Sequence, residues 1–149
     1  MIEIIYDDIL NANTDIIVHQ VNCMGVMGAG LALFIKKEYP RAYKVYRNAC
    51  IRNDKKSLLG KIQMVSVGDG KFICNMFAQL EYGRNKVQTD YNAIEECMDK
   101  IYTFAKLNNL TVAIPYNIGC GLAGGDWNTV KSIIESRFKD KSIVKFYKK

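Results

Sequence analysis

The sequence predicts an α/β fold: a three-layer α/β/α sandwich built around a mixed, mostly parallel sheet of six strands. Apolar, β-branched runs alternate with amphipathic segments along the 149 residues, and this alternation favours helices on both faces of one sheet. The run Asp15 to Val21 is almost continuously apolar, as expected for a strand that is covered on both faces. A chain of this length can bury one hydrophobic core, so we expect residues 1–149 to form a single domain.

Strands are expected where a short β-branched or aromatic run lies between turn residues. The tripeptide Gly68-Asp69-Gly70 indicates a hairpin between two such runs. The expected strands are, in chain order, residues 2–6, 15–21, 61–67, 71–77, 110–115 and 142–147.

Helices are expected where apolar residues recur at helical spacing after a start signal. Pro40 suits the first turn of one helix, and Thr89 can cap another. Lys36 and Lys37 suit the C-terminal end of the helix before Pro40, where the helix dipole favours cations. Residues 52–57 read as a polar link. The expected helices are residues 30–39, 41–50, 89–107 and 126–138.

Charge and composition limit the classes of function. The 21 basic and 15 acidic residues give a formal charge of +6, which favours anionic partners such as nucleic acid or a phosphorylated metabolite. The chain has no run of 18 apolar residues and no basic segment at its start, so we expect no membrane partner, no signal peptide and a cytoplasmic location. Five cysteines without a CxxC pair, and a single histidine, predict reduced thiols, no metal site and no cofactor. We expect a monomer.

The segment Gly25 to Leu31, which reads Gly-Val-Met-Gly-Ala-Gly-Leu, follows a predicted strand and opens a predicted helix. Free backbone N–H groups and the positive end of the helix dipole at such a place suit an anion. The glycine spacing matches neither the Walker pattern nor the dinucleotide fingerprint. The alternative is that these glycines only allow the helix to pack closely on the strand.

A second glycine-rich segment, Gly119 to Trp127, repeats this arrangement after another predicted strand. Two such loops at one edge of a parallel sheet can hold the two phosphates of a diphosphate with main-chain donors. A tight turn without a ligand is the alternative explanation.

Together with Asp8-Ile9, Val18 to Cys23 and Pro115 to Ile118, these two segments resemble the macrodomain family, an ADP-ribose-binding fold. The resemblance covers essentially the whole chain. Within the family, the His-x-Val-Asn-Cys stretch and the Gly-Cys-Gly-Leu loop are similar to the branch that includes the terminal ADP-ribose glycohydrolase and the ADP-ribose-1''-phosphate processing proteins.

The resemblance implies a set of ligand contacts. Asp8 would accept a hydrogen bond from the adenine amine, Asn22 would lie beside the distal ribose, and either Phe146 or Tyr147 would cover the adenine. Asp8 and Asn22 can instead be turn residues, and the aromatic pair can belong to the core. The implied ligand-binding residues are Asp8, Ile9, Gln20, Asn22, Met27, Gly28, Ala29, Gly30, Leu31, Gly119, Cys120, Gly121, Leu122, Ala123, Gly124 and Tyr147.

Asp126 and His19 are the candidate catalytic residues. In the glycohydrolase branch a lysine forms a covalent adduct and an aspartate releases it, but Gln79 and Ala123 stand at those positions in this chain. The covalent mechanism is therefore not expected, unless the loop 81–86 folds back and brings Lys86 into place.

Each candidate also has a structural explanation. Asp126 precedes an apolar helix and is a favourable N-cap, and His19 lies inside an apolar strand, where a core histidine is common. Cys120 lies near a predicted helix start, which lowers a thiol pKa, but the sequence places no histidine beside it and we expect it to be passive.

We therefore expect an ADP-ribose-binding macrodomain that hydrolyses ADP-ribosyl linkages on protein, nucleic acid or O-acetyl-ADP-ribose. The alternatives are a phosphatase that acts on ADP-ribose-1''-phosphate and a non-catalytic reader of ADP-ribose. The expected partners are accordingly ADP-ribose and ADP-ribosylated protein or nucleic acid.

Overall fold

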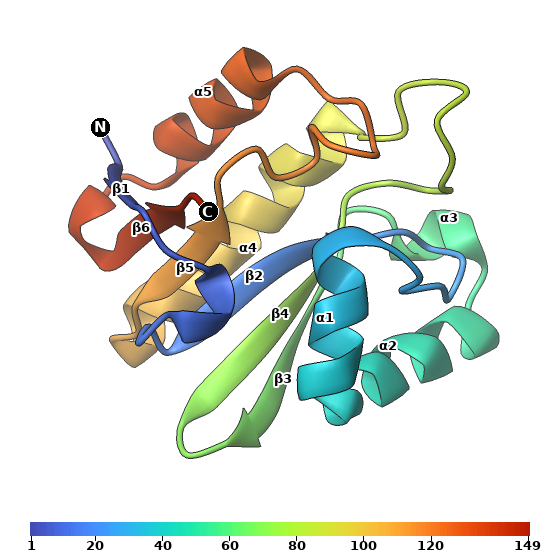
Figure 1. Cartoon of the computed structure of the whole chain (residues 1–149), viewed down its shortest axis with the longest axis horizontal. Coiled ribbons are helices and arrows are strands. Elements are labelled where there is room, and N and C mark those ends of the chain that lie inside the picture. Colours follow the sequence, from blue (N-terminus) through green and yellow to red (C-terminus); the bar gives the residue numbers. More distant parts are fainter.

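A six-stranded sheet with the strand order β1-β6-β5-β2-β4-β3 runs through the computed structural model, which describes residues 1–149 (Figure 1). Only the pair of β3 and β4 is antiparallel, and all other neighbouring strands are parallel. The predicted mixed, mostly parallel sheet is confirmed. The strands are β1 (Glu3–Ile5), β2 (Ile16–Val21), β3 (Ile62–Gly68), β4 (Lys71–Phe77), β5 (Val112–Pro115) and β6 (Val144–Tyr147).

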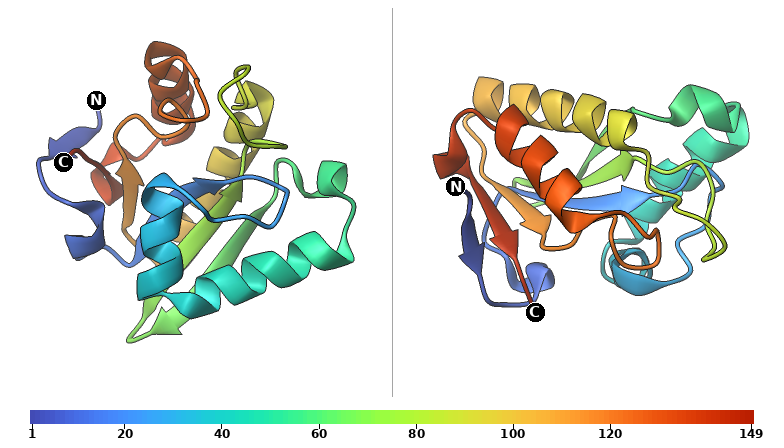
Figure 2. Two further views of the ribbon diagram at one scale, coloured as in Figure 1. Left: turned by 45° about the vertical axis from the view of Figure 1, so that its right-hand side comes forward. Right: turned by 90° about the horizontal axis from the view of Figure 1, so that it is seen from above.

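Helices cover both faces of this sheet and make the predicted three layers. Figure 2 shows α1 and α2 against one face, and α4 and α5 against the other. The α-helices are α1 (Gly30–Glu38), α2 (Pro40–Arg52), α3 (Lys55–Leu58), α4 (Tyr91–Asn108) and α5 (Trp127–Arg137), and two short 3-10 helices span Ile9–Asn11 and Lys141–Ile143. No helix combines the length and the apolar character that crossing a membrane requires.

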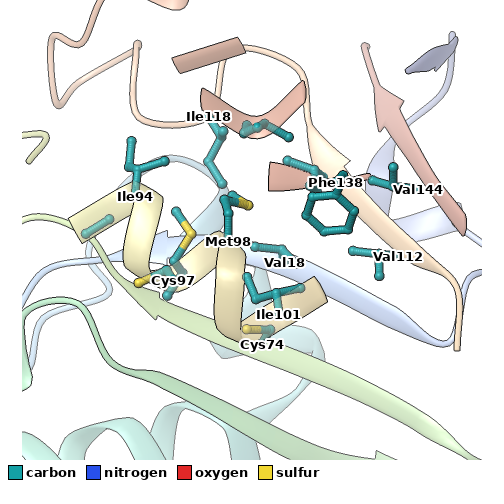
Figure 3. Close-up of a cluster of buried hydrophobic side chains, with 14 of the residues drawn as sticks. Val18, Cys74, Ile94, Cys97, Met98, Ile101, Val112, Ile118, Phe138 and Val144 are labelled. Carbon is teal, nitrogen blue, oxygen red and sulfur yellow. The ribbon is translucent and has the colours of Figure 1, made fainter. Parts of the chain in front are cut away.

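Strand β2 shows why both faces must be covered. Ile16 and Val18 pack into the large cluster that α4 and α5 close, while Ile17 packs into a second cluster with residues of α1 and α2. Figure 3 shows the larger cluster, in which Met98 of α4 lies among side chains from the strands. Because successive side chains of a strand point to opposite faces, a strand that is apolar at nearly every position fits only a central place in the sheet.

Two sequence predictions are wrong in detail. The cap of α4 is Asp90, whose side chain accepts a hydrogen bond from the backbone N–H of Ala93, whereas the hydroxyl of Thr89 donates to the carbonyl of Gly119. Residues 52–57, predicted to be a polar link, overlap the end of α2 and contain most of α3. The turn around Asp69 is confirmed as the hairpin between β3 and β4.

The parallel strands bring three long connections to one edge of the sheet. The carboxyl ends of β2, β4 and β5 lead into residues 22–29, 78–90 and 116–126, and the first and third of these connections contain the glycine-rich segments. Open parallel sheets bind ligands outside the carboxyl ends of their strands. The fold therefore places both glycine-rich segments where such a ligand would lie.

Candidate ligand-binding cleft

A cavity of about 670 Å³ lies at the carboxyl ends of β2, β4 and β5, which is within the usual size range of small-molecule sites. All three connections line it. The lining residues are His19 to Asn22, Val26, Gly28 to Ala32, Gln79, Tyr82 to Arg84, Pro115 to Gly119 and Gly121 to Ala123.

Residues 28–32 form one wall of this cavity with the start of α1. The N-cap residue Ala29 offers no side-chain acceptor, and no protein group accepts a hydrogen bond from the backbone N–H groups of residues 28–32. Gly30 has a φ of 58°, a left-handed conformation that favours glycine. The wall therefore presents free main-chain donors at the positive end of a helix.

Residues 119–125 form the facing wall. Backbone hydrogen bonds from Cys120 to Asn117 and from Gly125 to Gly119 fold this segment into tight turns, and they leave the N–H groups of residues 121–123 without a protein acceptor. A Cβ on Gly119 would lie 2.8 Å from Oε1 of Gln20, so no larger residue fits there without a shift. This segment also presents free main-chain donors to the cavity.

Asn22 holds the first glycine-rich connection, residues 22–29, in shape. Its Oδ1 accepts hydrogen bonds from the Met24 backbone N–H at 2.9 Å and from the Tyr46 hydroxyl at 2.6 Å. Its Nδ2 donates to the Val26 carbonyl at 2.8 Å, and the Tyr46 oxygen accepts from the Val26 N–H at 2.9 Å. One N–H of the Asn22 amide is left for a ligand.

Gln20 begins a polar chain on the cavity floor. Its Nε2 donates to Oε1 of Gln79 at 2.9 Å and to Oγ1 of Thr89 at 3.0 Å, and these two bonds define which end of the Gln20 amide is the carbonyl. Oε1 of Gln20 is buried and has no partner. It is an unused acceptor in a residue that lines the cavity.

His19 lines the cavity but is almost fully buried. Its Nε2 lies 2.6 Å from Oδ1 of Asn75, whose Nδ2 donates to Gln63 and to the Ala42 carbonyl, so Nε2 carries the proton and Nδ1 is an acceptor without a partner. Burial lowers the pKa of His19 to about 4, against the opposing effect of the Asn75 hydrogen bond. The imidazole is therefore neutral at pH 7.

Asp126 caps α5 and does not line the cavity. Its Oδ2 accepts from the Thr129 backbone N–H at 3.0 Å and from the Thr129 hydroxyl at 2.8 Å, and the residue is exposed. The expectation of a lowered Cys120 thiol pKa is wrong, because burial and the charge of Asp126 raise this pKa to about 11. The predicted passive role of Cys120 agrees with a protonated thiol.

The residues predicted for the adenine lie beside the cavity rather than in its lining. Asp8 caps the short helix at Ile9 and contacts Lys149 at 3.2 Å, and the Leu10 N–H lowers the pKa of the Asp8 carboxyl. Ile9 packs in the same apolar cluster as Tyr147. The suggestion that Phe146 covers the adenine is wrong, because its ring is fully buried beside Trp127.

Eleven of the eighteen predicted site residues line the cavity: His19, Gln20, Asn22, Gly28, Ala29, Gly30, Leu31, Gly119, Gly121, Leu122 and Ala123. The others lie outside the lining: Asp8, Ile9, Met27, Cys120, Gly124, Asp126 and Tyr147. Met27 in particular is buried in the apolar cluster around Tyr46.

The wall formed by Tyr82, Gly83 and Arg84 was not predicted from the sequence. Loop 80–88 does fold back, because the backbone N–H groups of Gln88 and Thr89 donate to the Ala123 carbonyl, but Lys86 is not part of the lining. One signal could have found this wall: the segment follows a strand that neighbours β2, so it must leave the sheet at the same edge.

These features define an α/β protein with a ligand cleft at the carboxyl edge of its sheet, walled by main-chain donors from two glycine-rich loops. No three His, Cys, Asp or Glu side chains lie together as a group of metal ligands. The family model "Macro domain" matches residues 18–134, and the chain belongs to this family.

Relatives support this assignment. A curated relative from Mycobacterium tuberculosis, named DNA ADP-ribosyl glycohydrolase, is 36% identical over 135 residues, which are 89% of this chain and 37% of the relative. This chain therefore spans little more than a third of the length of that relative.

Solved structures agree in fold. The macrodomain of Mycobacterium tuberculosis DarG has a TM-score of 0.83 at 29% identity, covering 100% of this chain and 98% of that one. Thermosipho africanus DarTG, solved in complex with ADP-ribose, has a TM-score of 0.77 at 25% identity, covering 98% of this chain and 41% of that one.

Proposed function

We propose that the cleft binds ADP-ribose and that the protein hydrolyses ADP-ribosyl linkages, with modified DNA as the first substrate to test. The observation that carries this proposal is the pair of facing walls, residues 28–32 and 121–123, whose backbone N–H groups have no protein acceptor. A diphosphate needs several donors on both sides, and main-chain N–H groups supply them without a metal ion. The names of the similar proteins point to the same ligand class.

The strand order suggests how the ligand would lie. Asp8 and Tyr147 belong to the β1–β6 side of the sheet, and Asn22 follows the central strand β2. We assign the adenine to the Asp8 side, the diphosphate to the two glycine loops and the distal ribose to Asn22. The linkage to be cleaved then lies toward β4.

Asp126 and His19 remain our candidates for the general acid or base in hydrolysis. Asp126 follows the second glycine loop directly and is exposed, and His19 offers an unpartnered Nδ1. General acid–base catalysis needs such a group near the ribose carbon. A monomeric state and a cytoplasmic location also stay predictions.

Binding is tested by calorimetry with ADP-ribose, AMP and NAD. Gly121 lines the cavity and a Cβ there meets no atom within 4 Å, so Gly121→Trp is expected to obstruct ligand binding without disturbing the fold. Ser132→Trp on the exposed surface of α5 is the matched control. ADP-ribose should bind the wild type and Ser132→Trp equally, and Gly121→Trp not at all. Equal binding to all three proteins would place the ligand elsewhere.

Turnover is tested with a substrate panel. Release of ADP-ribose from an ADP-ribosylated oligonucleotide or from a glutamate-linked peptide supports hydrolysis. Release of inorganic phosphate from ADP-ribose-1''-phosphate would instead assign a phosphatase. A protein that binds ADP-ribose and converts none of these substrates is a reader.

A further inference from the structure

The cleft wall on the β4 side carries an exposed aromatic ring and an unpaired cation. Tyr82 and Arg84 come from the connection between β4 and α4, and both line the cavity. Tyr82 is 57% exposed, and no acidic group pairs with Arg84. Neither side chain has a structural role in the fold that would account for its position.

The acidic side chains near this wall already have other partners. Glu81 forms an ion pair with Lys55 at 2.6 Å, which lowers the pKa of the Glu81 carboxyl, and Asp90 caps α4. The charges that remain on the segment are those of Arg84 and Lys86, both exposed. The wall is therefore positive and presents a free ring.

The position of the wall assigns it to the far end of the ligand. The sheet order β1-β6-β5-β2-β4-β3 puts the connection after β4 on the opposite side of β2 from Asp8 and Tyr147. If the adenine lies near Asp8, the group attached to the distal ribose leaves the cleft past Tyr82 and Arg84. This step rests on the proposed function.

We propose that Tyr82 and Arg84 form a docking surface for the single-stranded nucleic acid that carries the ADP-ribose. Tyr82 stacks on a base of the modified strand, and Arg84 contacts a backbone phosphate, with Lys86 beside it. Aromatic platforms next to cations are the usual means of binding single strands, because every base has a flat face and every nucleotide a phosphate. An acidic peptide offers charge for Arg84 but no flat ring for Tyr82.

The test compares two affinities in each protein: the Kd for an ADP-ribosylated single-stranded DNA oligonucleotide and the Kd for free ADP-ribose. Binding is measured under conditions in which the protein does not hydrolyse the linkage, or within a contact time too short for hydrolysis, so that the modified strand stays intact. The variants are Tyr82→Ala, Tyr82→Phe, Arg84→Ala and Arg84→Lys. Phe34→Ala and Arg52→Ala are the controls, because both residues are exposed and neither lines the cavity.

Tyr82→Ala is expected to weaken oligonucleotide binding by about fivefold or more, the factor that loss of one stacked base implies, and Tyr82→Phe should restore it. Arg84→Ala should weaken it as well and reduce the slope of log Kd against log salt concentration by about 0.7, as for one phosphate contact to a single strand. Arg84→Lys should retain the salt slope. Binding of free ADP-ribose should stay unchanged in the controls Phe34→Ala and Arg52→Ala, and in the Tyr82 and Arg84 variants it should change much less than oligonucleotide binding.

Three outcomes would overturn the inference. In the first, the variants weaken free ADP-ribose as much as the oligonucleotide, so that the two residues bind the diphosphate. In the second, an ADP-ribosylated glutamate peptide loses as much affinity as the oligonucleotide, so that the surface does not select nucleic acid. In the third, neither affinity changes.

A wild-type protein that binds no ADP-ribose would refute the proposed function itself. Failure of the proposed function and failure of this inference therefore give different results.

Discussion

Leu122 of the second glycine loop lies against Gly30 at the start of α1: a Cβ built on Gly30 would be 3.9 Å from Leu122 Cδ1. The two loops come from different connections of the sheet and meet across the cleft. Their free N–H groups therefore belong to one site, and a ligand held by one loop is within reach of the other.

Gly119→Ala is expected to destabilise the protein. Gly119 has a φ of 75°, where a side chain costs about 1–2 kcal/mol. The new methyl group would also lie 2.8 Å from Gln20 Oε1 and 3.0 Å from Thr89 Oγ1. We expect urea unfolding to show a loss of about 1–3 kcal/mol in the free energy of unfolding.

Gly121→Ala is the control for this substitution. Gly121 has no left-handed φ and no atom within 4 Å of its built Cβ, so its free energy of unfolding should stay within about 0.5 kcal/mol of the wild type. Equal unfolding midpoints for the two variants would contradict the close contact at Gly119.

The layers of the fold and the edge of the sheet that carries the site could be predicted, because both follow from patterns of residues that are neighbours in the sequence. The apolar run at β2 requires a central strand, and glycines between a strand and a helix mark the ligand edge whatever the rest of the chain does. Which of two adjacent residues caps a helix could not be predicted: Thr89 and Asp90 are both good caps, and a tertiary bond to Gly119 engages Thr89.

The contacts within the site depend on partners that are distant in sequence. Tyr46 looks like an ordinary core residue of an amphipathic helix, and only the fold places its hydroxyl on Asn22. The same holds for Asn75, which lies in β4 and sets the tautomer of His19. Periodicity shows that such residues are buried but not which polar atom they meet.

Tyr46→Phe is expected to loosen the first loop without removing the fold. The substitution keeps the ring, which stacks on Phe77, but takes away the acceptor of the Val26 N–H and one donor to Asn22 Oδ1. Buried groups left unpaired cost about 1–3 kcal/mol in the free energy of unfolding. We expect this loss in urea unfolding, together with weaker ADP-ribose binding in calorimetry. Tyr43→Phe on the same helix is the control, because the Tyr43 hydroxyl makes no hydrogen bond, and it should leave both quantities unchanged. A Tyr46→Phe protein with wild-type affinity would show that the loop keeps its shape without the Tyr46 hydroxyl.

Asp126 can be tested for a cap role and a catalytic role separately. Asp126→Ala removes the acceptor for the Thr129 N–H and should lower the free energy of unfolding by about 1 kcal/mol. Asp126→Asn retains a cap acceptor, so its stability and its ADP-ribose affinity should stay at the wild-type level. If the carboxylate orients water, Asp126→Asn loses hydrolysis at least tenfold. Wild-type turnover in Asp126→Asn would limit the residue to capping α5.

His19 gives the protein a pH-dependent stability of defined sign. Its pKa is about 4 in the folded protein and about 6.5 when exposed, because burial disfavours the charged imidazole. Below pH 6.5 the unfolded chain therefore binds a proton that the folded chain does not. This group therefore has no effect on the free energy of unfolding above pH 6.5. As the pH is lowered from 6.5 to 4, it lowers the free energy of unfolding by about 3 kcal/mol.

The variant His19→Gln isolates this effect, since it has no titrating group at the position and can still donate to Asn75 Oδ1. Acids with a lowered pKa, such as Asp8 and Asp140, lose their own contribution as the pH falls, but they do so equally in both proteins. The difference in free energy of unfolding between the wild type and His19→Gln should therefore shift steadily against the wild type from pH 6.5 to pH 4. A constant difference across this range, or an NMR titration of His19 near pH 6.5, would mean that the imidazole is hydrated in solution and that its surroundings are open to water.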